Sequence, residues 1–467
     1  MCIFSTKKNS IKLPNTLTKI LKLLQEKGAS PILVGGCVRD HFLNLQIKDY
    51  DIEVFHIKDF ETLSKYLEQF GKIKLVGKSF GVLKLSVDND EYDFALPRVE
   101  KKVSKGHKGF EVISNSCLSF KEAAIRRDFT INAIGYDFIK DEFLDPFNGL
   151  KDLENRTLKH IDDNSFIEDP LRVYRAVQFS ARFDFNLDKN TFILCKKMVL
   201  NNDLDELAKE RIFEELKKLF LKSCKPSIGF TLLKELGILK YFSELEALIG
   251  CEQEYEYHPE GDVWIHTLMT LDEMVKLKTG DEYKDLVLFL AILCHDLGKP
   301  LCTKEINRKI TSHKHETLGI EPTLSFLEKL TNDKKLINDV LPLVKYHLSP
   351  FQLYLHNSSD KAVRRLSVKV DIEMLCLVCL ADCLGRDIKD KSKCHKAISW
   401  LKKKANELEV SNEGPKPIVM GKDLIKLGFT PGKLFKEILS FAFDLQIDED
   451  MKKEEIIQKI EENYIKG

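Results

Sequence analysis

A glycine pair followed by two closely spaced aspartates constrains this chain more than any other feature. Gly35 and Gly36 directly follow an apolar segment, and Asp49 and Asp51 lie one residue apart on the next expected strand. Residues i and i+2 of a strand share a face, so the carboxylates would repel each other without a cation, and such hard oxygen ligands suit Mg²⁺. Glycine lets the backbone approach a phosphate closely. The pattern predicts a site for a metal-bound triphosphate.

The spacing of apolar residues predicts an α+β region up to about residue 160 and almost only helices after it. Residues 410–420 carry glycine, two prolines and polar residues, which is typical of a linker. Helices are expected at 14–27 and 37–45, strands at 31–35 and 47–55, and a hairpin at 74–87 and 90–97 that turns near residues 88–90.

Bulk composition favours a globular protein of several domains. The 467 residues suffice for two to four domains, and 43% hydrophobic with 31% charged residues is typical of soluble proteins. There is no run of 18 apolar residues and no apolar signal segment, so a cytoplasmic location without a membrane is expected. The twelve cysteines lack disulfide-like spacing and are expected to be reduced and buried, with Cys376, Cys379 and Cys383 packed in the core.

Further motifs follow the aspartates in a fixed order. They are RRDFTINAIGYD at 126–137, DPFNGLKDLENRTL at 145–158 and EDPLRVYRAVQFSAR at 168–182. Together these segments resemble the nucleotidyltransferase superfamily, in particular the class II tRNA nucleotidyltransferases (CCA-adding enzymes) and the related bacterial poly(A) polymerases. The resemblance covers about the first 220 residues and implies a polymerase-beta-like head, a mixed sheet with helices.

The resemblance implies attack of a tRNA 3′-hydroxyl on the α-phosphate of CTP or ATP, assisted by two Mg²⁺ ions. Asp49 and Asp51 would be metal ligands, and Asp93 matches the position of a third carboxylate, with Glu91 and Glu100 as alternatives. Residues 98–117 align with a flexible loop that the family needs to switch from C to A addition. The expected contacts to the nucleotide's phosphates and ribose are Gly36, Arg39, Arg127 and Asp128.

The segment that begins at Glu168 fits the family's EDxxR signature for choosing bases. Asp169 and Arg172, three residues apart, would share one helix face. Asp169 as acceptor beside Arg172 as donor would complement the amine and the unprotonated ring nitrogen of C and of A. G and U present the reverse order, a carbonyl beside an N–H. Asp169 before a proline could instead be an ordinary helix cap. Arg175 matches a further nucleotide-binding position, and Glu168 belongs to the same signature.

A second resemblance covers about residues 258–387. HPEGDVWIHTLMTLD at 258–272 and LAILCHDLGKP at 290–300 are similar to the HD phosphohydrolase domain of one bacterial branch of CCA-adding enzymes. It implies hydrolysis of phosphomonoesters or 2′,3′-cyclic phosphates with a transition metal such as Ni²⁺, Mn²⁺ or Co²⁺, although some HD domains are degenerate. The implied metal ligands are His266, His295, Asp296 and Asp382, with Lys299 near a phosphate and His313, His315 and His347 available for a second metal or for the substrate.

The expected domains are a nucleotidyltransferase head at 1–160, a nucleotide-selecting neck at 161–225, a helical body with the HD domain at 226–410, and a tRNA-binding tail at 411–467. Three alternatives stay open at this point: a poly(A) polymerase, an enzyme that adds only CC or only A, and a phosphohydrolase whose head merely holds RNA. The sequence does not decide between a monomer and a homodimer.

Overall fold

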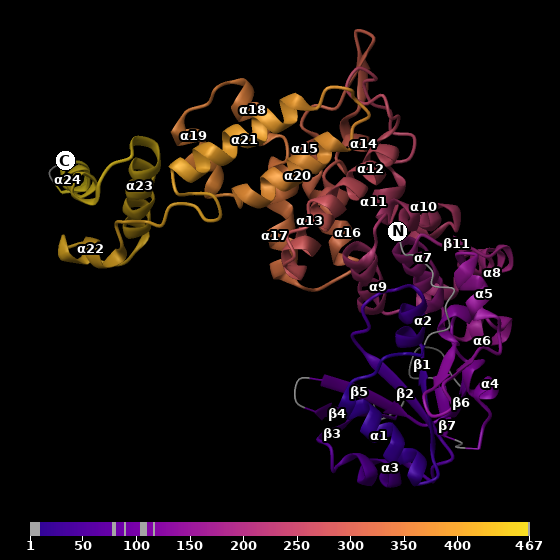
Figure 1. Ribbon diagram of the computed structural model, residues 1–467. Helices are drawn as coiled ribbons and strands as arrows, with labels where there is room; N and C mark the ends of the chain where they lie inside the picture. The colour runs from indigo at the N-terminus through magenta and orange to yellow at the C-terminus, as the bar shows by residue number, and fades with distance from the viewer. Residues whose placement is uncertain (1–9, 77–80, 88–89, 103–109, 115–116, 466–467) are drawn as a thin grey trace. The chain divides into compact units, whose positions relative to one another are not determined.

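The computed structural model describes residues 10–465 except 77–80, 88–89, 103–109 and 115–116 (Figure 1). The chain divides into two compact units, residues 1–238 and 239–467. The finer division expected at residues 160, 225 and 410 stays a prediction. No helix in the described part of the chain is long and apolar enough to cross a membrane.

A seven-stranded mixed sheet forms the head, in the strand order β3-β4-β5-β2-β1-β8-β9. β2 and β5 are parallel neighbours, whereas β1 runs antiparallel to β2. The register places Asp51 of β2 opposite Asp93 of β5. The strands are β1 Ser30–Val34, β2 Tyr50–Phe55, β3 Lys72–Val76, β4 Val82–Val87, β5 Asp90–Ala95, β8 Gly135–Asp137 and β9 Glu142–Leu144.

Helices accompany this sheet, and the first of them shows why the sequence pattern was readable. Leu17, Ile20, Leu21 and Leu24 recur at helical spacing and are all buried, which confirms the helix expected at 14–27. The helices of the head are α1 Asn15–Glu26, α2 Gly36–Phe42, α3 Phe60–Leu67, α4 Phe120–Ala124 and α5 Gly149–Glu154.

Three local expectations were wrong in detail. Strand β2 begins at Tyr50, so Asp49 lies just before the strand rather than on it. The expected strand 74–87 is two strands, β3 and β4, which pair antiparallel, and residues 88–89 of the expected turn lie outside the described residues. The expected flexible loop contains a two-stranded ribbon, β6 Arg98–Lys102 and β7 Phe110–Ser114, while residues 103–109, with Gly106 and Gly109, lie outside the described residues.

Beyond the head the first unit is helical, apart from a short parallel pair of β10 Thr157–Leu158 and β11 Asn186–Leu187. Helix α7 is buried on most of its surface, including Val173, Ala176, Val177 and Ala181. This helix therefore forms the core of the neck. The helices here are α6 Asp163–Glu168, α7 Leu171–Phe183, α8 Lys189–Leu200, α9 Lys209–Lys222 and α10 Pro226–Glu235.

The second unit is built around α13 Glu282–Cys294, whose residues 285–294 are all buried. Such a helix is apolar all round because other helices cover every face. It packs against α12 Val263–Lys276, α17 Lys334–Tyr346 and α20 Ile372–Leu384. The remaining elements before residue 410 are α11 Ser243–Glu246, α14 Lys299–Cys302, β12 Lys304–Ile306, β13 Lys309–Thr311, α15 His315–Leu318, α16 Ile320–Glu328, α18 Ser349–Leu355, α19 Asp360–Ser367 and α21 Ser392–Glu407.

The tail has its own apolar cluster, which includes Leu424, Ile438 and Ile460. Ion pairs join it to α19, where Arg365 binds Asp448 at 2.7 Å. Exposed pairs of this kind contribute little stability and weaken with salt. The tail helices are α22 Gly421–Lys426, α23 Lys433–Glu449 and α24 Lys453–Tyr464.

The fold class is confirmed, since a mixed sheet with helices is followed by a chain that is almost only helical. The expectation about cysteines was partly wrong. Cys376, Cys379 and Cys383 are all buried as expected. Cys383 is not reduced, however, because it forms a disulfide with Cys394 of α21, and Cys117 and Cys224 are exposed. Cys383 and Cys394 are 11 residues apart and lie on different helices. Their pairing depends on how those helices pack, which the sequence alone does not show.

Candidate functional site

The glycine pair lies where the backbone passes between charged side chains. Gly35 has φ of +74° and caps α2. A Cβ at Gly35 would lie 3.3 Å from the Arg127 guanidinium and 3.5 Å from Asp51 Oδ2, and one at Gly36 would lie 3.5 Å from Arg39 Nη2. The positive φ favours glycine at Gly35, where a Cβ would also crowd the Arg127 side chain. At Gly36 a Cβ would make only an ordinary contact.

Asp51 lies near the start of the central strand β2, beside other acidic groups. Burial raises its pKa, and the nearby charges of Asp93 and Asp49 raise it further against the opposing effect of Arg127. A cation placed among these carboxylates would relieve the repulsion. Asp93, however, pairs with Lys84 at 3.6 Å. In the part of the chain that the structure describes, the three aspartates do not converge within 4.8 Å as the second-unit ligands do.

Glu53 is a site residue that the sequence analysis missed. It is 1% exposed and binds Arg126 at 2.9 Å and Arg127 at 3.3 Å. Burial alone would raise its pKa, but the two guanidinium groups outweigh burial and lower it. Glu53 follows Asp51 by two residues on the same strand, so the alternation that revealed Asp49 and Asp51 could have revealed Glu53.

Two arginines are held by buried partners. Arg175 of α7 binds Asp128 at 2.6 Å, and this contact with that of Asn132 lowers the pKa of Asp128 despite its burial. Arg39 of α2 donates to Asn132 Oδ1 at 2.7 Å and to Asp40 at 2.8 Å. Its guanidinium is thus shared between side chains of the protein, and Asp40 does hold Arg39 in place.

The base-selecting pair is arranged differently from the expectation. Helix α7 begins at Leu171, so Asp169 precedes it and does not share a helix face with Arg172. Asp169 accepts the N–H of Leu171 at 3.3 Å and pairs with Arg211 at 3.3 Å. The N-cap of α7 is Pro170, without a side-chain cap bond, so the expected cap role of Asp169 was wrong. A turn hydrogen bond and an ion pair engage its carboxylate instead. Arg211 of α9 was not among the expected site residues, because no motif singles it out.

Arg172 is fixed by the backbone of two other segments. Its guanidinium donates to the carbonyl oxygen of Ser165 at 2.6 Å and to that of Arg126. Charge-assisted hydrogen bonds of this kind restrict the orientation of a guanidinium. The side chain is consequently presented in one direction.

A cavity of about 590 Å³ collects most of the expected residues of the first unit. Asp93 and Glu168 do not line it, and Glu168 is the last residue of α6. The site roles of all these residues stay predictions. Those that line the cavity are Gly36, Arg39, Asp49, Asp51, Arg127, Asp128, Asp169, Arg172 and Arg175, joined by Arg182, Arg211, Lys218 and Lys222.

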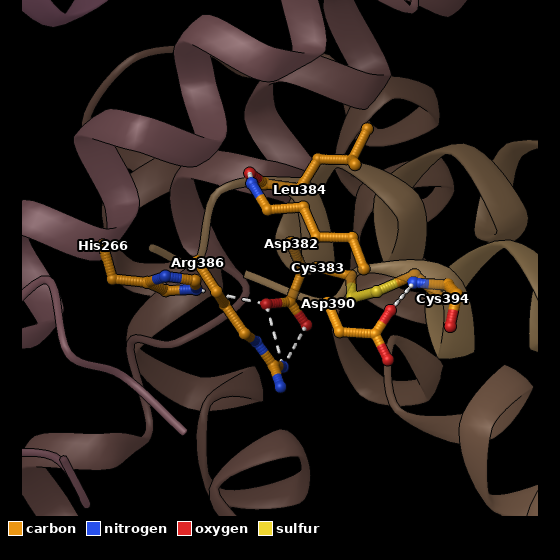
Figure 2. Close-up of a disulfide and its surroundings, with 9 residues drawn as sticks. His266, Asp382, Cys383, Leu384, Arg386, Asp390 and Cys394 are labelled. Carbon is orange, nitrogen blue, oxygen red and sulfur yellow. Dashed lines mark hydrogen bonds and ion pairs between the residues drawn. A yellow bond between two sulfur atoms is a disulfide. The ribbon is translucent and has the colours of Figure 1, made fainter. Parts of the chain in front are cut away.

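In the second unit the four expected metal ligands meet. His266 Nε2 lies 3.1 Å from Asp382 Oδ1 and 4.0 Å from Asp296 Oδ2. His295 Nε2 lies 3.2 Å from Asp296 Oδ2. All four side chains are at most 2% exposed. Figure 2 shows His266 and Arg386 both reaching Asp382, next to the disulfide of Cys383.

Each imidazole of the cluster turns its Nδ1 atom toward a hydrogen-bond acceptor. The Nδ1 atoms of His295, His315 and His347 each lie 2.7–2.8 Å from the carbonyl oxygen three residues earlier, and that of His266 lies 2.9 Å from Glu260. A proton held at Nδ1 leaves the lone pair at Nε2, which is the arrangement of metal-binding histidines.

Two buried atoms of this cluster have no hydrogen-bond partner in the described structure, His295 Nε2 and Asp296 Oδ1. Burial, His295 and His315 lower the pKa of His347 to about 3, so its imidazole is neutral. Burial also acts to lower the pKa of His295, but the charges of Asp296 and Asp382 outweigh it and raise that pKa. An unpartnered imidazole nitrogen beside an unpartnered carboxylate oxygen fits a divalent cation. Asp296 belongs to two groups of possible ligands, one with His266 and His295 and one with His315 and His347.

Glu260 is a supporting residue that the sequence analysis missed. Its Oε1 lies 2.8 Å from His258 Nδ1 and 2.9 Å from His266 Nδ1, and its Oε2 accepts the N–H of Asp387. Beside the cluster, a cavity of about 640 Å³ is lined by Asp296, Lys299, His315, His347, Asp382 and Arg386, with His258 and His313.

Gly298, next to the ligands, provides a test of how tightly the cluster is built. A Cβ there would overlap the carbonyl oxygen of His315 and lie 2.6 Å from the nitrogen of Gly319. We expect Gly298→Ala to lower the free energy of unfolding by roughly 1–3 kcal/mol and to weaken metal binding by displacing His315. Thermal unfolding and metal analysis would check this, with Gly432→Ala as the control, since a Cβ there would meet only the carbonyl oxygen of Thr430, at 4.0 Å. An unaltered metal content in Gly298→Ala would contradict it.

Comparison with known proteins places these sites in context. A poly A polymerase head domain matches residues 32–159, a probable RNA and SrmB-binding site of polymerase A matches 184–249, and an HD domain matches 263–387. A multifunctional CCA protein of Mannheimia succiniciproducens is 37% identical over 369 residues, which cover 76% of this chain and 84% of that protein.

Solved structures share the fold. The Bacillus stearothermophilus CCA-adding enzyme in complex with CTP aligns with a TM-score of 0.65 at 20% identity, over 96% of this chain and 98% of that one. The Thermotoga maritima CCA-adding enzyme complexed with a tRNA aligns with a TM-score of 0.58 at 20% identity, over 96% of this chain and 95% of that one.

Proposed function

Because this chain belongs to the family of multifunctional CCA proteins, we propose that it adds C, C and A to the 3′ end of tRNA from CTP and ATP. The observation that carries the proposal is the cavity of the first unit, which is lined by Asp49 and Asp51 at the start of β2 as well as by Asp169 and Arg172. One end of this cavity suits a metal-bound triphosphate and the other suits a base. The resemblance read from the motifs is confirmed at the level of the family.

Asp49, Asp51 and Asp93 would hold the Mg²⁺ ions of the head. The metal supplies charge neutralisation for the attacking and leaving oxygens when it is bound. The raised pKa of Asp51 supports this role, because the like charges of Asp93 and Asp49 beside it favour a cation. For Asp93 to join the ligand set, its contact with Lys84 must be exchanged for the metal.

Asp169 and Arg172 would read the base, and CTP and ATP are the nucleotides whose edges suit them. Arg172 is oriented by backbone carbonyls, while Asp169 is paired with Arg211. An incoming amine must therefore displace Arg211 from Asp169. A base with the reverse order of donor and acceptor would leave both side chains opposed to like partners.

The second unit would carry the phosphohydrolase activity. His266, His295, Asp296 and Asp382 would hold a divalent transition metal such as Ni²⁺, Mn²⁺ or Co²⁺, and the orphaned atoms His295 Nε2 and Asp296 Oδ1 support this. A bound metal supplies Lewis acidity and an activated water. The substrate would be a phosphomonoester or a 2′,3′-cyclic phosphate at a damaged RNA end.

A second metal is supported in the same place. Asp296 Oδ1 lies 3.3 Å from His315 Nε2, and His315 Nε2 lies 3.3 Å from His347 Nε2. The cations beside this cavity, Lys299 and Arg386, would meet the phosphate.

Because the proposed hydrolysis depends on bound metal ions, EDTA is expected to abolish the hydrolysis of 2′,3′-cyclic AMP.

The product length of a tRNA transcript that ends at the discriminator base tests the main proposal. With Mg²⁺, we expect two additions from CTP alone and three from CTP with ATP, and none from UTP or GTP. A long ladder from ATP alone would instead make the chain a poly(A) polymerase. Addition of only CC or only A would restrict the proposal to a partial enzyme, and no extension would contradict it.

A further inference from the structure

One buried polar atom at the nucleotide cavity has no hydrogen-bond partner among the residues that the structure describes. Gln178 of α7 is 1% exposed, and its Nε2 makes no hydrogen bond in the described structure. The same residue lines the cavity of about 590 Å³. A buried amide without a partner costs free energy, and such groups are rare unless a ligand or water satisfies them.

The place of Gln178 along α7 indicates which part of a nucleotide it meets. Arg172, at the base end, lies six residues earlier, which corresponds to about 9 Å along the axis. Arg182, about 6 Å further along, contacts Asp40 at 3.8 Å, the carboxylate that also holds Arg39 beside Gly36. Gln178 is therefore nearer to the triphosphate end than to the base end.

The charge of the cavity explains why a neutral donor suits this position. The lining carries eight arginines and lysines against four aspartates, an excess of four positive charges. The Mg²⁺ ions proposed for Asp49 and Asp51 would add further positive charge. A neutral amide N–H donates in a defined direction without adding more.

We propose that the Gln178 amide donates an N–H to the triphosphate of the bound nucleotide, so that the ligand supplies the partner that the protein lacks. This inference rests on the proposed function of the cavity. It assigns a nucleotide contact to a residue that no charge or acid–base motif would reveal.

The matched variants Gln178→Leu and Ser180→Ala test the proposal. Ser180 lies on the same helix, is 1% exposed and has an equally unpartnered hydroxyl, but it does not line the cavity. We expect both variants to melt no lower than the wild type without ligand, because each loses an unsatisfied group. Gln178→Leu should raise the Kd for CTP about tenfold, as expected for a lost hydrogen bond to a charged group, while Ser180→Ala should not.

Cytidine and the variant Gln178→Glu complete the experiment. The affinity for cytidine, which has no phosphate, should be unchanged in Gln178→Leu, and Gln178→Glu should lose more CTP affinity than Gln178→Leu because it faces the triphosphate with a carboxylate. If Gln178→Leu and Gln178→Glu bound CTP with the wild-type affinity, the inference about Gln178 would be overturned while the proposed function would stand. The same would follow if Gln178→Leu lost as much affinity for cytidine as for CTP. A wild-type protein that binds no CTP would overturn the proposed function together with it.

Discussion

Replacing Asp51 by asparagine is expected to lower CCA addition by roughly 10³-fold or more, since a carboxylate that holds the catalytic cation is lost. The protein should remain folded. Burial and the charges of Asp93 and Asp49 already raise the pKa of Asp51, so a neutral side chain removes repulsion rather than stability. Extension of a tRNA transcript and a thermal unfolding curve would measure both effects.

Glu91 offers a control on the same strand as Asp93. It is exposed and pairs with Lys84 at 3.1 Å. Asp93→Asn should lose most of its activity, whereas Glu91→Gln should extend tRNA at close to the wild-type rate. If Asp51→Asn still added nucleotides normally, the head would not be the polymerising site. If Glu91→Gln failed and Asp93→Asn did not, the third carboxylate would be Glu91.

Variants of Asp296 and of His347 are expected to differ in the number of metal ions that the protein retains. Asp296 belongs to both groups of possible ligands, and His347 belongs to only one. After purification with Mn²⁺ or Ni²⁺, we expect two ions per chain in the wild type, one in His347→Ala and fewer than one in Asp296→Asn. Hydrolysis of 2′,3′-cyclic AMP should fall by roughly 10³-fold in Asp296→Asn, while tRNA extension persists.

The exposed His395 provides the control for these measurements. His395→Ala should keep the metal content and hydrolysis of the wild type. One ion in the wild type, unchanged in His347→Ala, would show that the site is mononuclear. Hydrolysis that resists both EDTA and Asp296→Asn would remove the phosphohydrolase from the second unit altogether.

The site residues that could be predicted from the sequence are those that belong to short local motifs. Gly35 and Asp51 are recognisable because a glycine pair and alternating acids have a local physical meaning, and the adjacent His295 and Asp296 are recognisable for the same reason. Helix α1 was readable from four leucines and isoleucines at helical spacing. These features depend on neighbours within a few residues.

The supporting residues depend on distant partners instead. Glu53 meets Arg127 across 74 positions, and Arg211 meets Asp169 across 42. Glu260 accepts a backbone N–H from Asp387, 127 positions away. Glu53 shares the alternation of Asp49 and Asp51, but nothing local in the sequence distinguishes Arg211 and Glu260 from solvated charged residues. The position of Asp169 outside α7 could not be predicted either. A following proline is compatible with a residue just before a helix or at its start, so the local sequence does not decide between the two.

The backbone contacts of Arg172 have a consequence for how the protein tolerates change over generations. The two carbonyl oxygens that orient its guanidinium belong to Ser165 and Arg126, and every amino acid supplies a carbonyl. Substitution of either side chain leaves these oxygens available, and at Ser165 removes only a longer contact of its Oγ with Arg172, at 3.2 Å. If Arg172 and Asp169 read the base as proposed, changes at Ser165 and Arg126 should alter nucleotide choice less than changes at Arg172 itself and at the carboxylate of Asp169.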